Sequence, residues 1–141
     1  MPEARAVMLA AISERQIQEM VRQTARDWNW LAYHSWTSLY SPSGYPDVVA
    51  LKGERLVVAE VKGPRGKLSP EQRVWLDGWL SIENAEVYLW QVNKMVDDRE
   101  EIAHILWGDP VPEGGWKSAW RARREHLELR REPRLLNNSA R

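Results

Sequence analysis

The sequence predicts a single α/β domain in which a mixed β-sheet is flanked by helices. Two observations carry this prediction. Amphipathic segments with apolar residues three and four positions apart occur between short runs rich in β-branched residues. The chain of 141 residues is also long enough for one hydrophobic core and too short for two. The expected order is helix, strand, hairpin, helix, strand, helix.

The first clear element begins at Ser13, because Ser-Glu-Arg-Gln is a capping box with Gln16 three residues after the cap. Apolar residues at helical spacing then predict a helix from about 13 to 28. The segment 30–36 alternates between apolar and polar residues, as a strand does. Residues 38–46 have the Ser, Pro and Gly content of a loop.

A hairpin follows, with strands at 47–51 and 55–62 joined by a turn at 52–54. Ser69 caps the next helix, which runs to about 81, with Pro70 at its first position and Gln72 closing a second capping box. The rest of the chain predicts a strand at 86–92, a helix capped by Asp97 or Asp98 that ends near Gly108, a linker, and a charged helix at 116–131.

Composition excludes several classes of protein. The chain has no cysteine, which rules out disulfides, cysteine zinc sites and thiol catalysis. No apolar run is long enough for a membrane span, and the N-terminus lacks the cleavage pattern of a signal peptide. We therefore expect a cytoplasmic protein that makes no contact with membranes.

Basic residues gather at the C-terminus although the formal net charge is zero. From Lys117 onward there are eight lysines and arginines against three glutamates. Such a tail can contact a phosphate backbone, or it can be a solvated terminus. Alternatively, Trp116, Trp120, Leu127 and Leu129 pack a helix onto the domain or onto a second subunit, with the arginines on its outer face.

Three polar residues of the hairpin are the strongest candidates for chemistry. Glu60 and Lys62 lie two apart, so their side chains share one face of a strand that is otherwise apolar. Burying these charges is costly unless they are paired or bind an ion. Asp47 begins the partner strand and can reach the same end.

Two converging carboxylates supply the hard oxygen ligands that Mg²⁺ prefers, and a metal ion lowers the pKa of a bound water. Lys62 can then position that water or stabilise charge on a phosphate in the transition state. The alternative is a surface hairpin with an ordinary Glu–Lys pair, since an Asp, Glu-x-Lys triplet alone is weakly specific.

The longer pattern resembles a known family. Pro46-Asp47 followed by Glu60-Val-Lys62 resembles the PD-(D/E)xK nuclease superfamily, which has a restriction-endonuclease-like core. With Gly44-Tyr-Pro-Asp, the glycine after Lys62 and the segment GKLSPEQ, the pattern resembles the VRR-NUC branch of that superfamily, found in phages and DNA repair nucleases. The resemblance covers about Ser13 to Leu106. It divides the chain into a nuclease domain at 1–108 and a linker with a basic C-terminal helical extension at 109–141.

The resemblance also implies roles for individual residues. Asp47 and Glu60 would be ligands of Mg²⁺ or Mn²⁺, with the backbone carbonyl of Val61 as a third, and Lys62 would be the catalytic lysine. Gln72 would touch the metal-bound water or the scissile phosphate, in addition to or instead of closing its capping box.

The family also has an acid in its first helix, and two glutamates are candidates for it. At 100° per residue, Glu14 falls inside the apolar stripe centred on Ile17, and Glu19 faces water. We therefore expect Glu14 to act on the metal, directly or through water. Weaker candidates for contacts with DNA are His34, Ser43, Tyr45, Arg65 and Lys67. Trp75 and Trp79 could stack on exposed bases, but their helical spacing favours packing in the core or at an interface.

Together these implications describe a stand-alone phage-type DNA endonuclease for branched DNA such as Holliday junctions, acting as a homodimer. One alternative is a non-catalytic DNA-binding or assembly module on the same fold, whose signature would be the loss of Asp47, Glu60 or Lys62. Another is a nuclease for linear, flap or single-stranded substrates, or for RNA.

Overall fold

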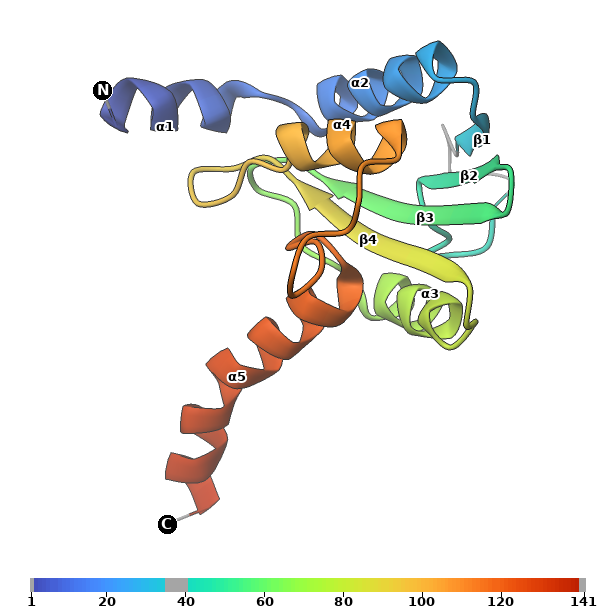
Figure 1. Ribbon diagram of the computed structural model, residues 1–141. Helices are drawn as coiled ribbons and strands as arrows, with labels where there is room; N and C mark the ends of the chain where they lie inside the picture. The colour runs from blue at the N-terminus through green and yellow to red at the C-terminus, as the bar shows by residue number, and fades with distance from the viewer. Residues whose placement is uncertain (1, 35–40, 140–141) are drawn as a thin grey trace.

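The sheet is mixed and lies at the centre of the domain. The computed structural model describes residues 2–34 and 41–139, and within them four strands lie side by side in chain order (Figure 1). The second strand is antiparallel to both the first and the third, and the fourth is parallel to the third. The strands are β1 (Leu31–His34), β2 (Val48–Lys52), β3 (Arg55–Lys62) and β4 (Ala85–Gln91).

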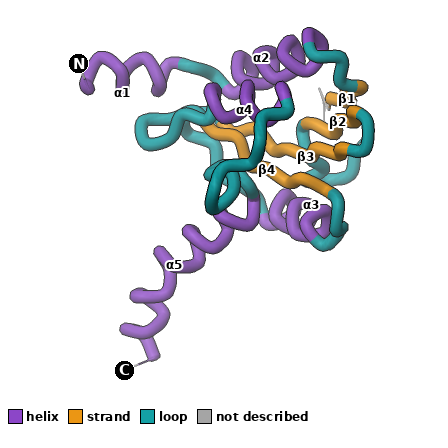
Figure 2. Tube along the Cα trace, viewed as in Figure 1, coloured by secondary structure: helices purple, strands orange, loops and turns teal. Residues whose placement is uncertain are grey.

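Helices cover both faces of this sheet, as Figure 2 shows. α2 (Glu14–Asp27) and α4 (Arg99–Trp107) pack on one face, where Val21, Ile102 and the strand residue Val57 are fully buried. On the opposite face Leu76 of α3 (Pro70–Leu80) packs against β4 and against Trp120, the first residue of α5 (Trp120–Ser139). The described chain is thus an α/β domain with a mixed sheet flanked by helices, as the sequence predicted.

Capping explains where two of these helices begin. Ser13 and Ser69 each accept a hydrogen bond from the backbone N–H three residues later. The side-chain oxygens of Gln16 and Gln72 in turn accept one from the N–H of Ser13 and Ser69, so both expected capping boxes are present. A third helix, α4, ends at Gly108, whose φ of 96° favours glycine. Within the described ranges, no helix is long and apolar enough to cross a membrane.

The structure corrects several local predictions. An additional helix, α1 (Pro2–Ala11), precedes the first expected one. The expected strand at 30–36 covers only Leu31–His34, and residues 35 and 36 lie outside the described part of the chain. Asp98 occupies the cap position of α4 but makes no capping bond, because its carboxylate accepts hydrogen bonds from the Gln91 N–H and from Arg123.

The C-terminal extension contacts the sheet before it leaves the domain. The helix expected at 116–131 begins later, at Trp120, because a turn precedes it and Ala119 forms an antiparallel bridge with Tyr88 of β4. Ser118 O accepts a hydrogen bond from Leu89 N over 2.9 Å, and the Trp120 indole donates to Asp77 over 2.7 Å. Beyond this anchor α5 extends away from the domain (Figure 1). The division at residue 108 stays a prediction, but residues 118–120 of the extension are packed against the domain.

Candidate active site

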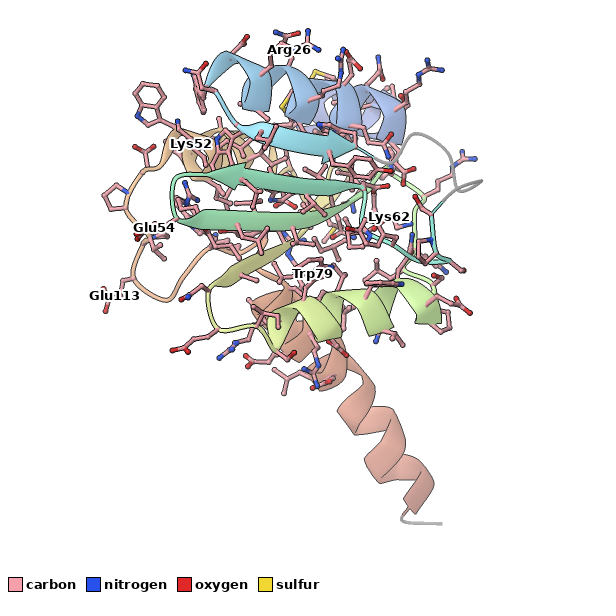
Figure 3. All side chains as sticks on the ribbon, turned by 90° about the vertical axis from the view of Figure 1, so that its right-hand side faces the viewer. Arg26, Lys52, Glu54, Lys62, Trp79 and Glu113 are labelled. Carbon is pink, nitrogen blue, oxygen red and sulfur yellow. The ribbon has the colours of Figure 1, made fainter. Side chains whose placement is uncertain are left out.

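The hairpin register brings the two expected carboxylates to one end of the sheet. Val48 pairs with Ala59, so Asp47, one residue earlier, lies opposite Glu60 at the open end of the hairpin. Lys62 follows two positions later on the same face. Figure 3 shows Lys62 at the opposite end of the hairpin from Lys52 and Glu54, which flank the turn. Backbone pairing alone therefore gathers Asp47, Glu60 and Lys62.

Glu60 is the most unusual of these groups because its carboxyl is buried, with 2% of the residue exposed. Its Oε1 accepts a hydrogen bond from Gln72 Nε2 over 2.9 Å and lies 3.8 Å from Lys62 Nζ. Its Oε2 is buried and has no hydrogen-bond partner among the described residues. Burial, together with the neighbouring Asp47 carboxylate, raises the pKa of Glu60 to about 9, against the lowering effect of Lys62.

Asp47 is oriented by the backbone of the same strand that carries Glu60. Its Oδ2 accepts a hydrogen bond from Val61 N over 2.8 Å. This bond fixes the carboxylate next to Glu60, and it places the Val61 peptide, whose carbonyl is an expected ligand, at the same end of the sheet. Asp47 remains half-exposed, so solvent and ligands can reach it.

Gln72 makes both of the interactions that the sequence left open for it. Its Oε1 accepts the Ser69 N–H over 2.9 Å, which closes the capping box, and its Nε2 donates to Glu60. Since Oε1 is held by the helix terminus, the amide can present only its N–H₂ group to the carboxyl. The start of α3 therefore orients Glu60.

The start of α2 reaches the same place from the other face of the sheet. Glu14, its first residue, is half-buried, and burial raises the pKa of its carboxyl while the charge of nearby Lys62 opposes the rise. Asp47 also acts on this carboxyl and raises the pKa further. Glu19, in contrast, is exposed and pairs with Arg22. The structure thus gathers Glu14, and not Glu19, with the hairpin residues.

Two glycines permit these approaches, and sequence reasoning did not assign them a role. A Cβ on Gly63 would lie 2.8 Å from Glu14 N, so the end of β3 can touch the start of α2 only without a side chain. A Cβ on Gly44 would lie 2.6 Å from Gln72 N, and its φ of 83° also favours glycine. Gly44 belongs to the motif Gly-Tyr-Pro-Asp and Gly63 to the motif Glu-Val-Lys-Gly. Their positions next to the charged residues were the sequence feature that could have revealed these close approaches.

The weaker candidates are placed differently from one another. The Ser43 carbonyl accepts a hydrogen bond from the Trp75 indole over 3.2 Å, and Tyr45 packs edge to face on Trp75. Ser43 and Tyr45 therefore contact α3 through Trp75. Arg65 and Lys67 are exposed in the loop after β3. Trp79 packs with the buried residues between α3 and the sheet.

His34 lies beside the hairpin at the end of β1. It pairs with Val48 and is near enough to Asp47 for the carboxylate to act on its pKa. Burial, followed by the charge of Arg22, nevertheless lowers the pKa of His34. A neutral imidazole next to Asp47 at neutral pH is therefore the expected state.

The donor set suits a hard divalent cation. No group of three His, Asp or Glu side chains in residues 2–34 and 41–139 forms a complete metal site. Mg²⁺ does not require one, because it is commonly held by one or two carboxylates, waters and substrate phosphate. The buried Glu60 Oε2 lies beside Asp47 and has no donor in the described part of the chain, so it is an oxygen that a cation would satisfy. The residues present therefore fit Mg²⁺ or Mn²⁺.

Two carboxylates and a lysine at the end of one hairpin, within a mixed sheet flanked by helices, define the PD-(D/E)xK class of nucleases. Comparison with protein families agrees, since the family model of the VRR-NUC domain matches residues 8–94. The chain belongs to the VRR-NUC family, a branch of that nuclease superfamily. No curated protein and no solved structure gives a significant match.

Proposed function

We propose that this VRR-NUC nuclease is a DNA endonuclease that hydrolyses phosphodiester bonds with Mg²⁺ or Mn²⁺ at Asp47, Glu60 and Lys62. The observation that carries the proposal is the Glu60 carboxyl, which is buried with one oxygen lacking a donor among the described residues. A buried carboxyl of this kind costs stability and is best explained by a ligand that it binds.

Each residue has a distinct part in this proposal. Asp47, Glu60 and the Val61 carbonyl would hold the cation, and Glu14 would act on it directly or through water. When bound, the cation supplies charge neutralisation at the phosphate and a more acidic water.

The groups around the cation are positioned by the protein itself. The side chain of Lys62 is 11% exposed, and its ammonium lies close to the Glu60 carboxyl. From there it can stabilise negative charge on the phosphate oxygens. Gln72 keeps Glu60 in place through the hydrogen bond from its Nε2. Preorganised groups of this kind need little rearrangement when the substrate binds.

We further propose that the enzyme acts as a homodimer on branched DNA such as four-way junctions. A symmetric dimer presents two sites to two strands. An exposed apolar surface at the edge of the sheet supports this, because Leu31 and Tyr33 of β1 and Leu51 of β2 are 74%, 56% and 47% exposed.

The proposal is tested by a cleavage panel of junction, flap, nicked, linear duplex and single-stranded DNA in Mg²⁺, Mn²⁺ or EDTA. We expect metal-dependent cleavage, fastest on the junction. Asp47→Ala, Glu60→Gln and Lys62→Ala should abolish cleavage while keeping the fold, as judged by circular dichroism. Glu54→Gln, at the other end of the same hairpin, is the matched control and should cleave normally. Full activity in EDTA, or in Glu60→Gln, would refute the mechanism.

A further inference from the structure

A groove of about 600 Å³ lies directly beside the candidate active site. We call it the basic groove and define it by Arg65 of the loop after β3, Leu89 and Gln91 of β4, Lys94 of the turn after β4, and Arg123 and His126 of α5. It is therefore built from the end of the nuclease core on one side and from the C-terminal helix on the other.

Two residues that line the groove, Leu89 and Gln91, lie next to residues of the candidate active site in the sheet. In the parallel pairing of β3 and β4, Glu60 lies beside Leu89 and Lys62 beside Gln91. Neighbours in such a pair share one face of the sheet, and adjacent strands are about 4.8 Å apart. Lys62 and the groove residue Gln91 are therefore one strand apart, and the loop after β3, whose Gly66 lies close to the Lys62 side chain, links the candidate active site to the groove.

The charged residues that line the groove are all basic. Among the described residues that line it there are two arginines, one lysine and one histidine, and none is acidic, although the whole chain has equal numbers of acids and bases. Arg123 is neutralised by Asp98, which lies behind it at 2.6 Å, and is only 13% exposed. Arg65 and Lys94 are exposed, and neither forms an ion pair with a described residue. They provide the positive charge that a ligand would meet.

The wall formed by α5 is held rigidly. Arg123 donates to Asp98 and to Gln91 Oε1, and through them joins α5 to β4 and to the start of α4. Leu127 packs into the apolar cluster that contains Leu76 and Trp120. This wall lies outside residues 8–94, the part of the chain that the family model matches.

We propose that the basic groove binds the phosphodiester backbone of the DNA strand on one side of the bond that is cleaved. The inference rests on the proposed function, because it takes the strand at Lys62 to be the substrate. Arg65 and Lys94, both on the side of the nuclease core, would bind phosphates independently of base sequence and set the position of the strand. The C-terminal helix would form the opposite wall and limit where the strand can lie.

Binding measured without cleavage tests the charge of the groove. Fluorescein-labelled four-way junction and linear duplex are titrated with the full-length protein in EDTA at three salt concentrations. Lys94→Glu and Arg65→Glu should each weaken binding about tenfold. In Lys94→Gln the plot of log K against log salt should become shallower, its slope losing about 0.9 in magnitude. This is the value for one phosphate that the protein no longer neutralises. Lys52→Glu makes the same charge change as Lys94→Glu at the far end of the sheet and should leave the affinity unchanged.

A second experiment locates the DNA. Because the chain has no cysteine, Met95→Cys places a single thiol at an exposed residue that lines the groove, 85% exposed in the native chain. DNA with thiol tethers at successive phosphates should form disulfide crosslinks to it only within a few nucleotides of the bond that the wild type cleaves, on one side. Lys52→Cys is the control.

The outcomes separate the groove from the function. Equal loss of affinity in Lys94→Glu and Lys52→Glu, no loss in either, or crosslinking no better from Met95→Cys than from Lys52→Cys would each overturn the basic groove. None of these results requires cleavage. Failure of the wild type to cleave any DNA with Mg²⁺ or Mn²⁺ would instead overturn the proposed function, whatever the binding data show.

Discussion

Gln72 connects the cap of α3 to the buried carboxyl of Glu60. Its Nε2 donates a hydrogen bond to Glu60 Oε1 over 2.9 Å, and its Oε1 accepts one from Ser69 N over 2.9 Å. A residue whose capping role is ordinary thus also orients the buried acid whose pKa is raised to about 9. The two roles use different atoms of one amide, so they can be separated experimentally.

The first prediction separates them. Ser69→Ala removes the cap, which should cost about 1 kcal/mol of unfolding free energy, and should leave single-turnover cleavage nearly unchanged. Gln72→Glu keeps an acceptor for Ser69 N–H but replaces the donor to Glu60 with a second carboxylate, so cleavage should fall at least about tenfold. Urea unfolding and single-turnover rates measure the two effects. If both variants lose activity equally, Gln72 acts only through the helix.

The second prediction concerns pH and metal. Since the pKa of Glu60 is raised from 4.5 to about 9 in the fold, the folded protein without metal retains a proton that the unfolded chain releases. The free energy of unfolding therefore falls as the pH rises from about 4.5 towards 9. Glu60→Gln cannot ionise, and its amide can donate to Asp47.

In EDTA at pH 8 we expect Glu60→Gln to be more stable than the wild type by at least about 1 kcal/mol, or about 3 °C in melting temperature. At pH 5 the difference should be much smaller. Adding Mg²⁺ should stabilise only the wild type, because binding to the folded state alone raises its stability. Calorimetry at the two pH values measures this. A variant less stable than the wild type at pH 8 in EDTA would contradict the buried, proton-bound state of Glu60.

The third prediction concerns the two glutamates of α2. Glu14→Gln should reduce single-turnover cleavage at least about tenfold, because Glu14 is grouped with Lys62 and Asp47. Glu19→Gln should cleave like the wild type, because the pair with Arg22 that it loses is exposed and lies away from the hairpin residues. Equal rates in the two variants would refute the assignment of Glu14.

The fourth prediction compares two glycines. In Gly63→Ala the new Cβ would lie 2.8 Å from Glu14 N, so α2 must move away from the end of β3. We expect a loss of about 1–3 kcal/mol of unfolding free energy, as for other overpacked sites, and reduced activity. In Gly78→Ala no described atom outside its helix lies within 4 Å of the new Cβ. That variant should gain about 0.5–1 kcal/mol from helix propensity. A stable, fully active Gly63→Ala would show that this close approach is unimportant.

The sequence predicted those parts of the molecule that follow from local chemistry. Capping boxes located the starts of α2 and α3, and strand alternation placed Glu60 and Lys62 on one face. It could not predict that Gly63 touches the backbone of Glu14, because that contact depends on how α2 crosses the sheet. The pairing of Asp98 with Arg123 was missed for the same reason: their separation of 25 residues leaves no local pattern. α1 was missed because its sequence carries no capping box.

The last prediction concerns the C-terminal extension, which the sequence allowed to be either a DNA-binding arm or a packed helix. The structure distinguishes its two halves. Trp120 is 1% exposed and bonded to Asp77, and Arg123 is bonded to Asp98. Deletion of residues 116–141 should therefore destabilise the domain by at least about 3 kcal/mol, the typical cost of removing one buried tryptophan side chain.

Deletion of residues 130–141 removes four arginines and one glutamate but leaves the Trp120 and Arg123 hydrogen bonds in place. Its melting temperature should stay within about 2 °C of the wild type. If the distal half binds DNA, the salt slope should become shallower by about 0.9 for each phosphate that the shortened protein no longer neutralises. The cleavage rate at saturating enzyme should not change, because no proposed ligand lies in this segment. Melting curves, binding at three salt concentrations and size-exclusion chromatography on both truncations measure these effects. An unchanged salt slope in the shorter deletion would show that the distal arginines do not bind DNA, and a stable protein after the longer deletion would show that the Trp120 anchor is dispensable.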